Sequence, residues 1–553
     1  MLEASFELIV PLVIASLIDK GIVTGDKAHI YRQVAILGVF AVVGCVTAIT
    51  AQYFAARAAI GFATDVRRDM FSHLMKLSHS DIDGLGINTM ITRITTDVNT
   101  AQNGVNMFLR LFLRSPFVVF GAMIMAFTID FRSALVFAVT IAVLFTFVVI
   151  IMFFNISALK EVQSRLDLLT GNIRENLMGV RVLRAFNHED SEMKDFEANN
   201  LGLVSKAKRA GRIGGLMNPL TYSLINLGIC SLIYVGAIRL RSGALSGGQV
   251  VALYNYMSQI LVELIKLANL VVILNRGLAS VDRVADVFDI KPSMEYGDKT
   301  LNNEDGVHFV FDNAHLRYEG DAEDSLKGIS FEAKSGETVG IIGGTGSGKT
   351  SLVNLLGRLY DVTEGRVLIN DRDIRDLSLD EINKTVGIVR QRAVLFKGSI
   401  RDNLLMGAEN ADDDSLMKAV KTAQALEVVE GKGGLDGTVE QGGRNFSGGQ
   451  RQRLSIARTL AAKTPVLVLD DSSSALDYAT DLALRRALAG LDYKPLIFVI
   501  SQRTSSIKHA DKILVLDDGE LVGLGTHEEL LDSCDIYREI HNSQIQKSEE
   551  VTA

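Results

Sequence analysis

The feature that most constrains the fold is a glycine-rich octapeptide, Gly343-Gly344-Thr345-Gly346-Ser347-Gly348-Lys349-Thr350. The run 337–342 before it is typical of a buried strand, and the run 351–356 after it is typical of a helix. A strand, a G-x-x-x-x-G-K-[ST] loop and a helix form a phosphate-binding loop, whose backbone N–H groups and helix N-terminus surround phosphate oxygens. The motif therefore predicts that Lys349 reaches the β- and γ-phosphates of a nucleotide and that the Thr350 hydroxyl binds Mg²⁺.

Apolar residues are unevenly distributed along the 553 residues, which are 48% hydrophobic and 22% charged. Long apolar runs lie before about residue 287, whereas the remainder has the composition of a soluble α/β domain. This asymmetry predicts a membrane half followed by a soluble half. The net charge of −8 gives no indication of a nucleic-acid partner. The three cysteines have no metal-site or disulfide spacing, so we expect buried small apolar residues at Cys45, Cys230 and Cys534.

Several apolar stretches reach the roughly 20 residues that a helix needs to cross a bilayer. They run over about residues 34–59, 105–129, 134–154, 213–238 and 250–274, with a tight connection at Asp130-Phe131-Arg132. An earlier stretch, up to Ile18, is interrupted by Glu3 and Glu7 and has neither a basic start nor a cleavage site. We interpret it as the end of a first transmembrane helix whose beginning is missing.

Charge in and around these stretches predicts their orientation. Basic residues concentrate in the two long polar segments that follow the stretches 34–59 and 134–154. This places both segments in the cytoplasm, on the side of the soluble half. Arg110, Arg114, Glu263 and Lys266 lie within stretches and should face the bundle interior or an aqueous cavity, because charge in lipid is costly. Glu263 and Lys266 are three residues apart and are expected to pair, with contact to cargo as the alternative.

Polar residues at strand ends and before the loop predict the rest of a nucleotide site. Tyr318 stands about 25 residues before the loop, where its ring could stack on adenine. Gln391 ends the strand-like run 386–391 and could bind Mg²⁺ or its water. Asp470 ends another apolar strand and is the expected carboxylate associated with Mg²⁺.

A second glycine-containing turn, Ser447-Gly448-Gly449-Gln450, opens a helical run and predicts a second anion site. A phosphate loop and a separate anion site on one chain suggest that two chains complete each other's nucleotide pockets. Two amphipathic segments in the long polar regions, 88–98 and 172–186, are either solvated helix extensions or devices that dock onto the ATP-binding half.

Together, GGTGSGKT, Gln391, FSGGQ, VLVLDD and the run 474–477 after a multi-span half resemble the ATP-binding cassette (ABC) transporters over essentially the whole chain. The resemblance is to half-size exporters of the multidrug and lipid type. It implies a dimer that holds two ATP molecules, each between one chain's phosphate loop and the other chain's Ser447, Gly448 and Gly449. It also implies that segments 88–98 and 172–186 contain coupling helices and that residues 438–440 contact them.

Two residues depart from the family pattern. Asp471 stands where the family usually has Glu, and Gln502 stands where it has the switch-loop His. Shortening Glu to Asp retracts the carboxylate by about 1 Å, and such a misplacement can cost about a hundredfold in rate. Gln502 can still donate a hydrogen bond to a γ-phosphate but cannot carry a proton as imidazole does. Retained activity after neutral drift is the alternative to a degenerate site that mainly holds ATP.

These observations predict an all-α polytopic membrane domain of the six-helix exporter type (1–288), a linker (289–305) and an α/β cassette (306–545). The expected function is ATP-driven export of a drug, lipid or peptide, with ATP and Mg²⁺ as cofactors. The chain would be the hydrolysis-impaired member of a heterodimer in a bacterial plasma membrane, in contact with membrane lipid and with its cassette in the cytoplasm. A slow homodimeric pump and an ATP-gated sensor without transport are the alternatives.

Overall fold

In the computed structural model, which describes residues 2–112, 114–301, 306–472 and 474–552, the chain folds into two compact units. The helical unit comprises Met1–Phe71 and Ile91–Asp289, and the second unit, the cassette, comprises Ser72–Met90 and Ile290–Ala553. Residues 1 and 113 of the expected membrane domain, residues 302–305 of the expected linker and residue 473 of the expected cassette lie outside the described residues.

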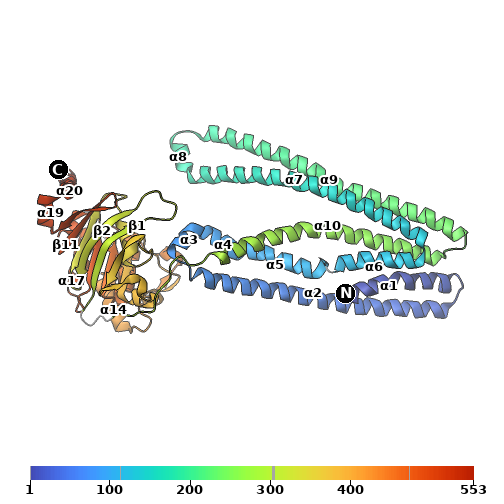
Figure 1. Cartoon of the computed structure of the whole chain (residues 1–553), viewed down its shortest axis with the longest axis horizontal. Coiled ribbons are helices and arrows are strands. Elements are labelled where there is room, and N and C mark those ends of the chain that lie inside the picture. The colour runs from blue at the N-terminus through green and yellow to red at the C-terminus, as the bar shows by residue number, and fades with distance from the viewer. Residues whose placement is uncertain (1, 113, 302–305, 473, 553) are drawn as a thin grey trace. The chain divides into compact units, whose positions relative to one another are not determined.

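Long helices make up the first unit (Figure 1). They are α1 (Leu2–Ser16), η1 (Leu17–Ile22), α2 (Lys27–Leu74), α4 (Ile87–Thr92), η2 (Arg93–Asp97), α5 (Val98–Met107), η3 (Phe108–Phe112), α6 (Arg114–Ile129), α7 (Phe131–Met178), α8 (Val180–Ala185), α9 (Glu189–Arg241) and α10 (Gly247–Asp289). Within the described residues, five helical stretches are long and apolar enough to cross a membrane: Lys27–Leu74, Ile87–Ile129, Phe131–Met178, Glu189–Arg241 and Gly247–Asp289. The first apolar stretch folds as the shorter α1 and η1.

The connection between the apolar stretches 105–129 and 134–154 is as tight as expected. Asp130 lies between α6 and α7 and caps α7, because its carboxylate accepts a hydrogen bond from the Ser133 N–H at 2.9 Å. The apolar stretch 105–129 is not one regular helix, since the π-helical turn η3 lies between α5 and α6. Helices α7 and α9 lie side by side and are joined through α8 (Figure 1).

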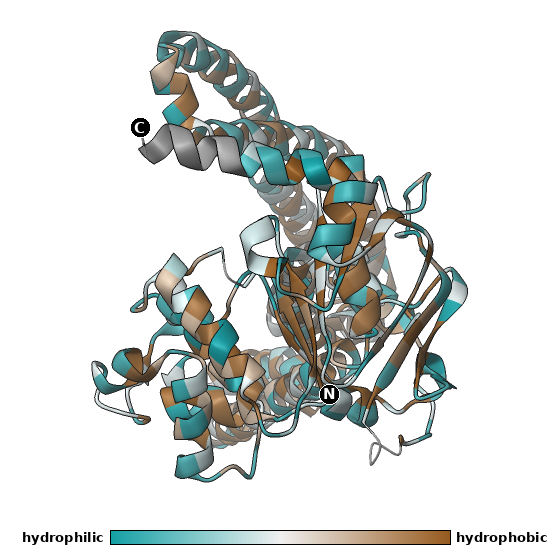
Figure 2. Ribbon diagram, turned by 90° about the vertical axis from the view of Figure 1, so that its left-hand side faces the viewer, coloured by the Kyte–Doolittle hydropathy of each residue, from teal (hydrophilic) through white to brown (hydrophobic). Residues whose placement is uncertain are grey.

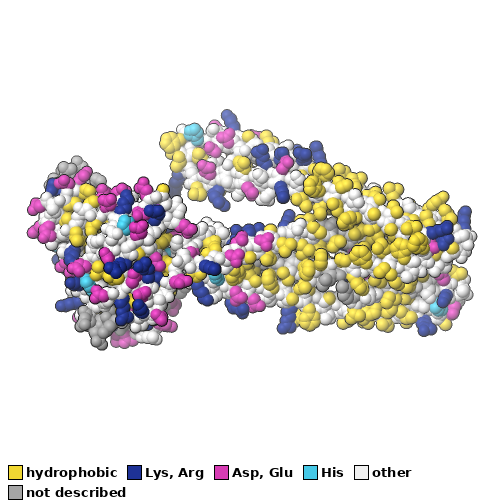
Figure 3. All heavy atoms as spheres, viewed as in Figure 1, with side chains coloured by type: hydrophobic (Ala, Val, Ile, Leu, Met, Phe, Trp, Pro, Cys, Tyr) yellow, Lys and Arg dark blue, Asp and Glu magenta, His cyan; other side chains and the backbone are white. Residues whose placement is uncertain are grey.

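Helix α10 packs against α1, α5 and α6. Glycines allow its close approach to α5, because a Cβ on Gly104 would come within 3.1 Å of the Gly277 Cα atom. The outer faces of the helices carry a band of hydrophobic side chains (Figure 3). Cys45 and Cys230 are exposed on α2 and α9, so the expectation of burial is wrong for them and right only for Cys534. Apolar residues of spanning helices face lipid as well as protein, which explains this difference.

The cassette contains two larger sheets and a small one. The four-stranded antiparallel sheet has the order β2-β1-β4-β5, with β1 (His308–Leu316), β2 (Leu326–Lys334), β4 (Glu364–Ile369) and β5 (Arg372–Asp373). The six-stranded sheet has the order β12-β11-β3-β10-β9-β6 and is parallel except for the β11–β12 pair. Its strands are β3 (Thr338–Gly343), β6 (Val386–Val389), β9 (Val466–Asp470), β10 (Leu496–Ile500), β11 (Lys512–Asp517) and β12 (Glu520–Gly525).

Short elements complete this unit: α3 (His79–Leu85), α11 (Lys349–Leu356), η4 (Ile374–Asp376), α12 (Leu379–Thr385), β7 (Gly398–Ser399), α13 (Ile400–Leu405), α14 (Asp413–Thr422), α15 (Leu426–Glu430), β8 (Thr438–Val439), η5 (Gln441–Gly443), α16 (Gly448–Ala461), α17 (Tyr478–Ala489), α18 (Thr504–Ile507), α19 (His527–Ser533) and α20 (Asp535–Thr552). Strands β7 and β8 form the small sheet.

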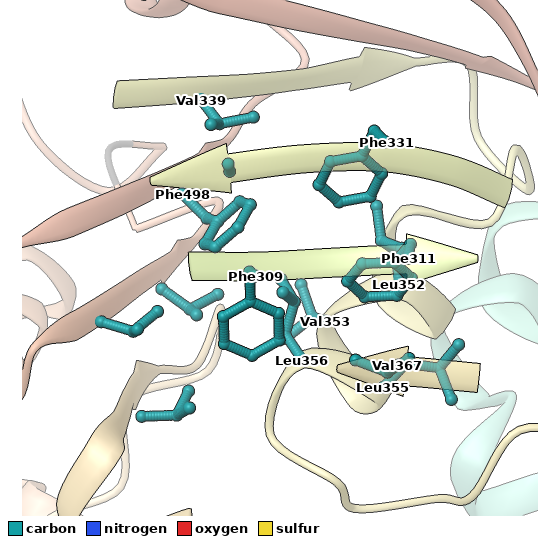
Figure 4. Close-up of a cluster of buried hydrophobic side chains, with 14 of the residues drawn as sticks. Phe309, Phe311, Phe331, Val339, Leu352, Val353, Leu355, Leu356, Val367 and Phe498 are labelled. Carbon is teal, nitrogen blue, oxygen red and sulfur yellow. The ribbon is translucent and has the colours of Figure 1, made fainter. Parts of the chain in front are cut away.

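A core of aromatic side chains joins the two larger sheets to α11 (Figure 4). Phe311 stacks on Phe331 with ring centroids 4.6 Å apart, and Phe309 meets Phe498 of β10 edge to face at 6.1 Å. Leu352 and Leu356 of α11 belong to the same buried cluster. Figure 2 shows the strands as largely hydrophobic ribbons. This core fixes β3 and α11, and therefore the loop between them, in a rigid frame.

Arg358, directly after α11, ties the linker to the cassette. Its buried guanidinium donates to the backbone oxygen of Glu295 at 2.6 Å and lies 4.7 Å from the centre of the Tyr296 ring. The same group pairs with Asp361 at 2.8 Å. The linker is thus held by specific contacts at its centre, although its described part after α10, residues 290–301, forms no long helix or strand.

Candidate nucleotide-binding site

The phosphate loop lies between β3 and α11 as the sequence predicts. Gly346 and Gly348 have φ angles of 84° and 94°, a left-handed backbone that favours glycine. A Cβ on Gly348 would also come within 2.8 Å of the Ser325 carbonyl oxygen. Thr345 and Thr350 are exposed, while Ser347 is buried. The loop therefore presents its backbone and the Thr350 hydroxyl at the N-terminus of α11, where an anion is favoured.

Lys349 lies over this loop. Its ammonium donates to the Gly343 carbonyl oxygen at 2.9 Å and to Ser347 Oγ at 3.2 Å. Burial lowers the pKa of Lys349, and the nearby carboxylates of Asp471 and Asp470 oppose that shift. A partly desolvated cation held at a helix N-terminus is suited to binding phosphate oxygens.

The carboxyl ends of β9 and β6 bring three predicted residues together. Asp470 is buried at the end of β9, and burial raises the pKa of its carboxyl group, a shift that Arg390 opposes and Asp471 adds to. The next residue, Asp471, accepts a hydrogen bond from Gln391 Nε2 at 3.0 Å. Parallel neighbouring strands end at the same edge of the sheet, which is why these residues meet.

Asp471 has a backbone that leaves its side chain little freedom. Its φ angle is 42°, and its N–H donates to the Ile500 carbonyl oxygen at 3.0 Å. The end of β10 therefore fixes where the carboxylate of Asp471 begins.

Gln502 follows β10, two residues after Ile500, and is exposed. Among the described residues, its side chain makes no hydrogen bond to Asp471, Gln391 or Lys349. The strand that precedes it lies between β3 and β9, so the switch loop begins beside both the phosphate loop and Asp470. The structure thus places Gln502 at the correct edge of the sheet without joining it to the other residues.

The second anion site is the N-terminus of α16. Ser447 caps this helix, since its Oγ accepts from the Gln450 N–H at 3.3 Å and Gln450 Oε1 accepts from the Ser447 N–H at 2.9 Å. Ser447 and Gly448 are exposed. Residues of α16 belong to a hydrophobic cluster separate from the one around α11. The two anion-binding turns of this chain are therefore built on different cores.

Tyr318, predicted to stack on adenine, lies two residues after β1 and is half-buried. Its hydroxyl donates to Ser351 Oγ at 3.1 Å and accepts from Asn354 Nδ2 at 3.0 Å. Its ring meets that of Tyr360 edge to face, with centroids 5.0 Å apart. The bonds to α11 hold the ring beside the phosphate loop. Ser351, Asn354 and Tyr360 carry no motif, and our reading of the sequence missed them.

A nucleotide with Mg²⁺ fits the residues present. A Cβ on Gly343 would collide with the Leu516 carbonyl oxygen and one on Gly348 with the Ser325 carbonyl oxygen, so glycine lets the loop pack closely and offer its backbone N–H groups at the start of α11. Thr350, Asp470 and Gln391 supply hydroxyl, carboxylate and amide oxygens, which are the ligands that Mg²⁺ prefers.

Helix α3 belongs to the cassette unit and precedes the segment 88–98, which we expected to dock. Tyr360 donates to Asp83 Oδ2 at 2.5 Å, and the Ser293 N–H donates to Asp81 at 3.1 Å. Ser78 caps α3 and bonds Ser293 Oγ at 2.7 Å. The segment 88–98 covers most of α4, η2 and the first residue of α5, and its Asp97 pairs with Arg283 of α10. The docking roles of segments 88–98 and 172–186 stay predictions.

Charged side chains gather within the helical unit. Glu263 is buried and accepts from Lys266 at 2.8 Å, which confirms the expected pair, and from Arg114 at 3.1 Å. Arg114 also pairs with Glu7 at 2.8 Å. A cavity of about 440 Å³ adjoins these groups; its lining includes Glu3, Gln52, Arg110, Arg114 and Lys266. The charged residues thus face the protein interior or a cavity, as the cost of charge in lipid predicts.

Comparison with known proteins identifies the family. The model of the ABC transporter transmembrane region matches residues 1–264, and the ABC transporter model matches residues 326–474. The chain is 33% identical to the uncharacterized ABC transporter ATP-binding protein YfiB of Bacillus subtilis, over 98% of this chain and 94% of the relative. This chain belongs to the ABC transporters.

Other relatives also match this chain over nearly its whole length. The chain is 34% identical to the uncharacterized ABC transporter ATP-binding protein Rv1273c of Mycobacterium tuberculosis, over 97% of this chain and 93% of the relative. It is 29% identical to the ATP-dependent lipid A-core flippase of Haemophilus ducreyi, over 96% and 91%. A solved bacterial Atm1-family ABC exporter with ATP bound shares the fold, with a TM-score of 0.83, 22% identity and coverage of 98% and 97%.

These comparisons confirm the predicted fold class, a helical transmembrane domain followed by an α/β cassette. The protein is an integral membrane transporter with its ATP-binding domain on the cytoplasmic side, and the relatives named are bacterial.

Proposed function

We propose that this chain is one half of a dimeric ABC exporter and that its own nucleotide site binds MgATP but hydrolyses it slowly. The phosphate loop, Lys349, Thr350 and Asp470 are complete, which supports binding. Export is supported by the relatives, which include a lipid A-core flippase and an ABC exporter of the same fold. The cavity with apolar and charged walls suits an amphipathic substrate of the drug, lipid or peptide class.

One observation supports the slow site most directly. The backbone of Asp471 is held by Ile500 at a φ of 42°, and its short carboxylate bonds to Gln391. A general base must lie within hydrogen-bond reach of the attacking water, and Asp471 falls short of the Glu position by about 1 Å. Gln502 can donate to a phosphate but cannot relay a proton. Both residues that handle water are altered, whereas the residues that bind the nucleotide are kept.

The proposed cycle assigns a role to each group of this chain. Lys349 and the loop amides neutralise the β- and γ-phosphates, and Tyr318 stacks on the base. Thr350, Gln391 and Asp470 would hold Mg²⁺, which would supply charge neutralisation on the phosphates. Ser447 with the Gly448 and Gly449 amides completes the site on the partner's phosphate loop. ATP would close the two cassettes, and hydrolysis at the partner's loop would reset them.

The test compares ATP hydrolysis by the purified chain alone and with a second half-transporter that has Glu and His at the altered positions. We expect robust hydrolysis only in the mixed dimer, and ATP-dependent uptake of cargo into inverted vesicles. Robust hydrolysis by the chain alone would favour a homodimeric pump. Nucleotide-driven closure without uptake of any cargo would favour a sensor.

A further inference from the structure

The C-terminal helix α20 is hydrogen-bonded to the switch loop. Gln544 Nε2 donates to the Gln502 carbonyl oxygen at 2.7 Å, and Gln544 Oε1 accepts from the Thr504 N–H at 2.9 Å. The Thr504 hydroxyl lies 3.1 Å from the same oxygen. Because a backbone N–H can only donate, the amide oxygen must face Thr504 and the amide nitrogen must face Gln502. One side chain thus holds the backbone on both sides of Arg503, directly after the loop residue that should face the γ-phosphate.

A neighbouring histidine strengthens this contact. His541 lies one turn earlier on α20 and places Nδ1 3.1 Å from Thr504 Oγ1. Thr504 is buried at the start of α18, where these bonds satisfy its hydroxyl and its N–H. On the other side of the loop, Arg485 of α17 donates to the Ser505 carbonyl oxygen at 2.8 Å. The switch loop is therefore fixed through its backbone from two helices.

Helix α20 is itself anchored against the strand that leads into the phosphate loop. Tyr537 is fully buried in a cluster that contains Ile342 of β3 and Ile507 of α18. Its hydroxyl lies 2.7 Å from His527 Nδ1, and burial raises the pKa of Tyr537 to about 12. Gln544 thus extends from a base that shares its packing with the phosphate-binding strand.

From this geometry we infer that Gln544 is a positioning residue for ATP hydrolysis, which sets the switch loop at a fixed distance from the phosphate loop. The side chain of residue 502 is exposed and can contact a γ-phosphate. The position of this side chain depends on the backbone, which Gln544 holds through the carbonyl oxygen of residue 502. A shift of about 1 Å in that residue is enough to reduce the rate severely. The inference is independent of whether the native site is slow, because any residue at position 502 is carried by the same backbone.

The test uses the full-length chain with Asp471→Glu and Gln502→His, assembled in lipid nanodiscs, so that hydrolysis at its own site is measurable. Gln544→Ala is added to this background, with Asn542→Ala as the control, because Asn542 is an exposed amide of the same helix. We expect Gln544→Ala to lower kcat by about tenfold and to change the KM for ATP by less than about twofold. Asn542→Ala should leave both values unchanged.

A second variant separates positioning from folding. Gln544→Glu keeps the acceptor for the Thr504 N–H but places an oxygen against the Gln502 carbonyl group, so we expect a similar loss of kcat with MgATP binding retained. In the unmodified chain, where no hydrolysis is needed, Gln544→Ala should speed amide hydrogen exchange at residues 502–504 and leave that of α11 unchanged. Unchanged exchange and kcat in Gln544→Ala would overturn the inference. An equal fall in Asn542→Ala, or a rise in KM alone, would overturn it too.

Discussion

The hydroxyl of Tyr360 donates a hydrogen bond to Asp83 Oδ2 at 2.5 Å and thereby joins α3 to the rest of the cassette unit. The ring of Tyr360 also packs edge to face on Tyr318, whose hydroxyl bonds to Ser351 and Asn354 of α11. Burial raises the pKa of Tyr360, and the bond to Asp83 adds to the shift, so the hydroxyl stays protonated and remains the donor. A continuous series of contacts therefore runs from the helix after the phosphate loop to α3, which follows the apolar helix α2 in the chain.

This series predicts that Tyr360→Phe uncouples transport from ATP. Phenylalanine keeps the ring against Tyr318 and removes only the hydroxyl, so MgATP binding should change by less than about twofold. The variant loses the hydrogen bond to the Asp83 carboxylate, and a hydrogen bond to a charged group typically contributes about 1.5–3 kcal/mol to stability. We expect fewer substrate molecules moved per ATP, measured as uptake and hydrolysis in the same vesicles. Tyr296→Phe, which leaves α3 untouched, is the control, and an unchanged ratio in Tyr360→Phe would contradict the prediction.

The residues predicted from local motifs lie in the expected local structure. The phosphate loop, Asp470 and the Ser447 cap each depend on a strand end or a helix start a few residues away, which short-range sequence patterns describe well. Gln544 could not be found this way. It lies 42 residues from Gln502 along the chain, and only the packing of α20 brings the two together.

Sequence patterns describe the membrane half less completely. Segment 88–98 has the amphipathic pattern of a docking helix, and its docking role stays a prediction, whereas no pattern indicated the bonds of α3 to Tyr360 and Ser293. The apolar stretch 105–129 contains η3, whose five residues are apolar except for Arg110. Hydropathy detects a spanning segment but does not distinguish α-helical from π-helical turns. Pairing of Glu263 with Lys266 was predictable, since residues three apart share a helix face.

Restoring the two altered residues should increase hydrolysis at this chain's own site. Asp471→Glu extends the carboxylate by one methylene from the same fixed backbone, and Gln502→His returns an imidazole to the switch loop. We expect the double variant to hydrolyse ATP about a hundredfold faster than the native chain at this site. The rate is measured with the partner's phosphate-loop lysine replaced, so that only one site turns over. A rate unchanged from the native chain would show that these two residues do not limit hydrolysis.

The buried carboxylate of Glu263 should stabilise the helical unit. It accepts from Lys266, Arg114 and Ser115, the last at 2.6 Å. Glu263→Gln removes the buried negative charge while keeping the shape, so Lys266 loses its carboxylate partner and Arg114 keeps only Glu7 and Glu3. Removing one member of a buried ion pair typically costs about 3–5 kcal/mol. We expect a clearly lower apparent Tm for the full-length protein in detergent.

Glu3→Gln provides a matched control for this variant. Glu3 also pairs with Arg114, but at 3.4 Å and with about a third of its side chain exposed. A pair of this kind contributes at most about 1 kcal/mol. The apparent Tm of Glu3→Gln should therefore stay close to that of the native protein. Equal losses in the two variants would show that the burial of Glu263 has no special effect.

The contact between His527 and Tyr537 makes the anchor of α20 sensitive to pH. Burial lowers the pKa of His527. The positive charges of His541, Lys508 and His509 lower this pKa further, whereas Glu528 opposes the shift. Its Nδ1 lies 2.7 Å from the Tyr537 hydroxyl and accepts from it in the neutral tautomer that carries the proton on Nε2, an acceptor that protonation of the ring removes.

Because the pKa of His527 is lower in the folded state than its ordinary 6.5, the unfolded state binds more protons between these two values. The stability that neutral His527 contributes is therefore complete above pH 6.5 and is lost as the pH falls towards the folded-state pKa. We expect the apparent Tm of the cassette to fall between about pH 7.5 and about pH 5.5. His527→Asn, which does not titrate and keeps an acceptor for Tyr537, should reduce this fall, whereas His188→Asn in the exposed turn before α9 should not. A native protein whose cassette gains stability on acidification in this range would contradict the sign of the effect.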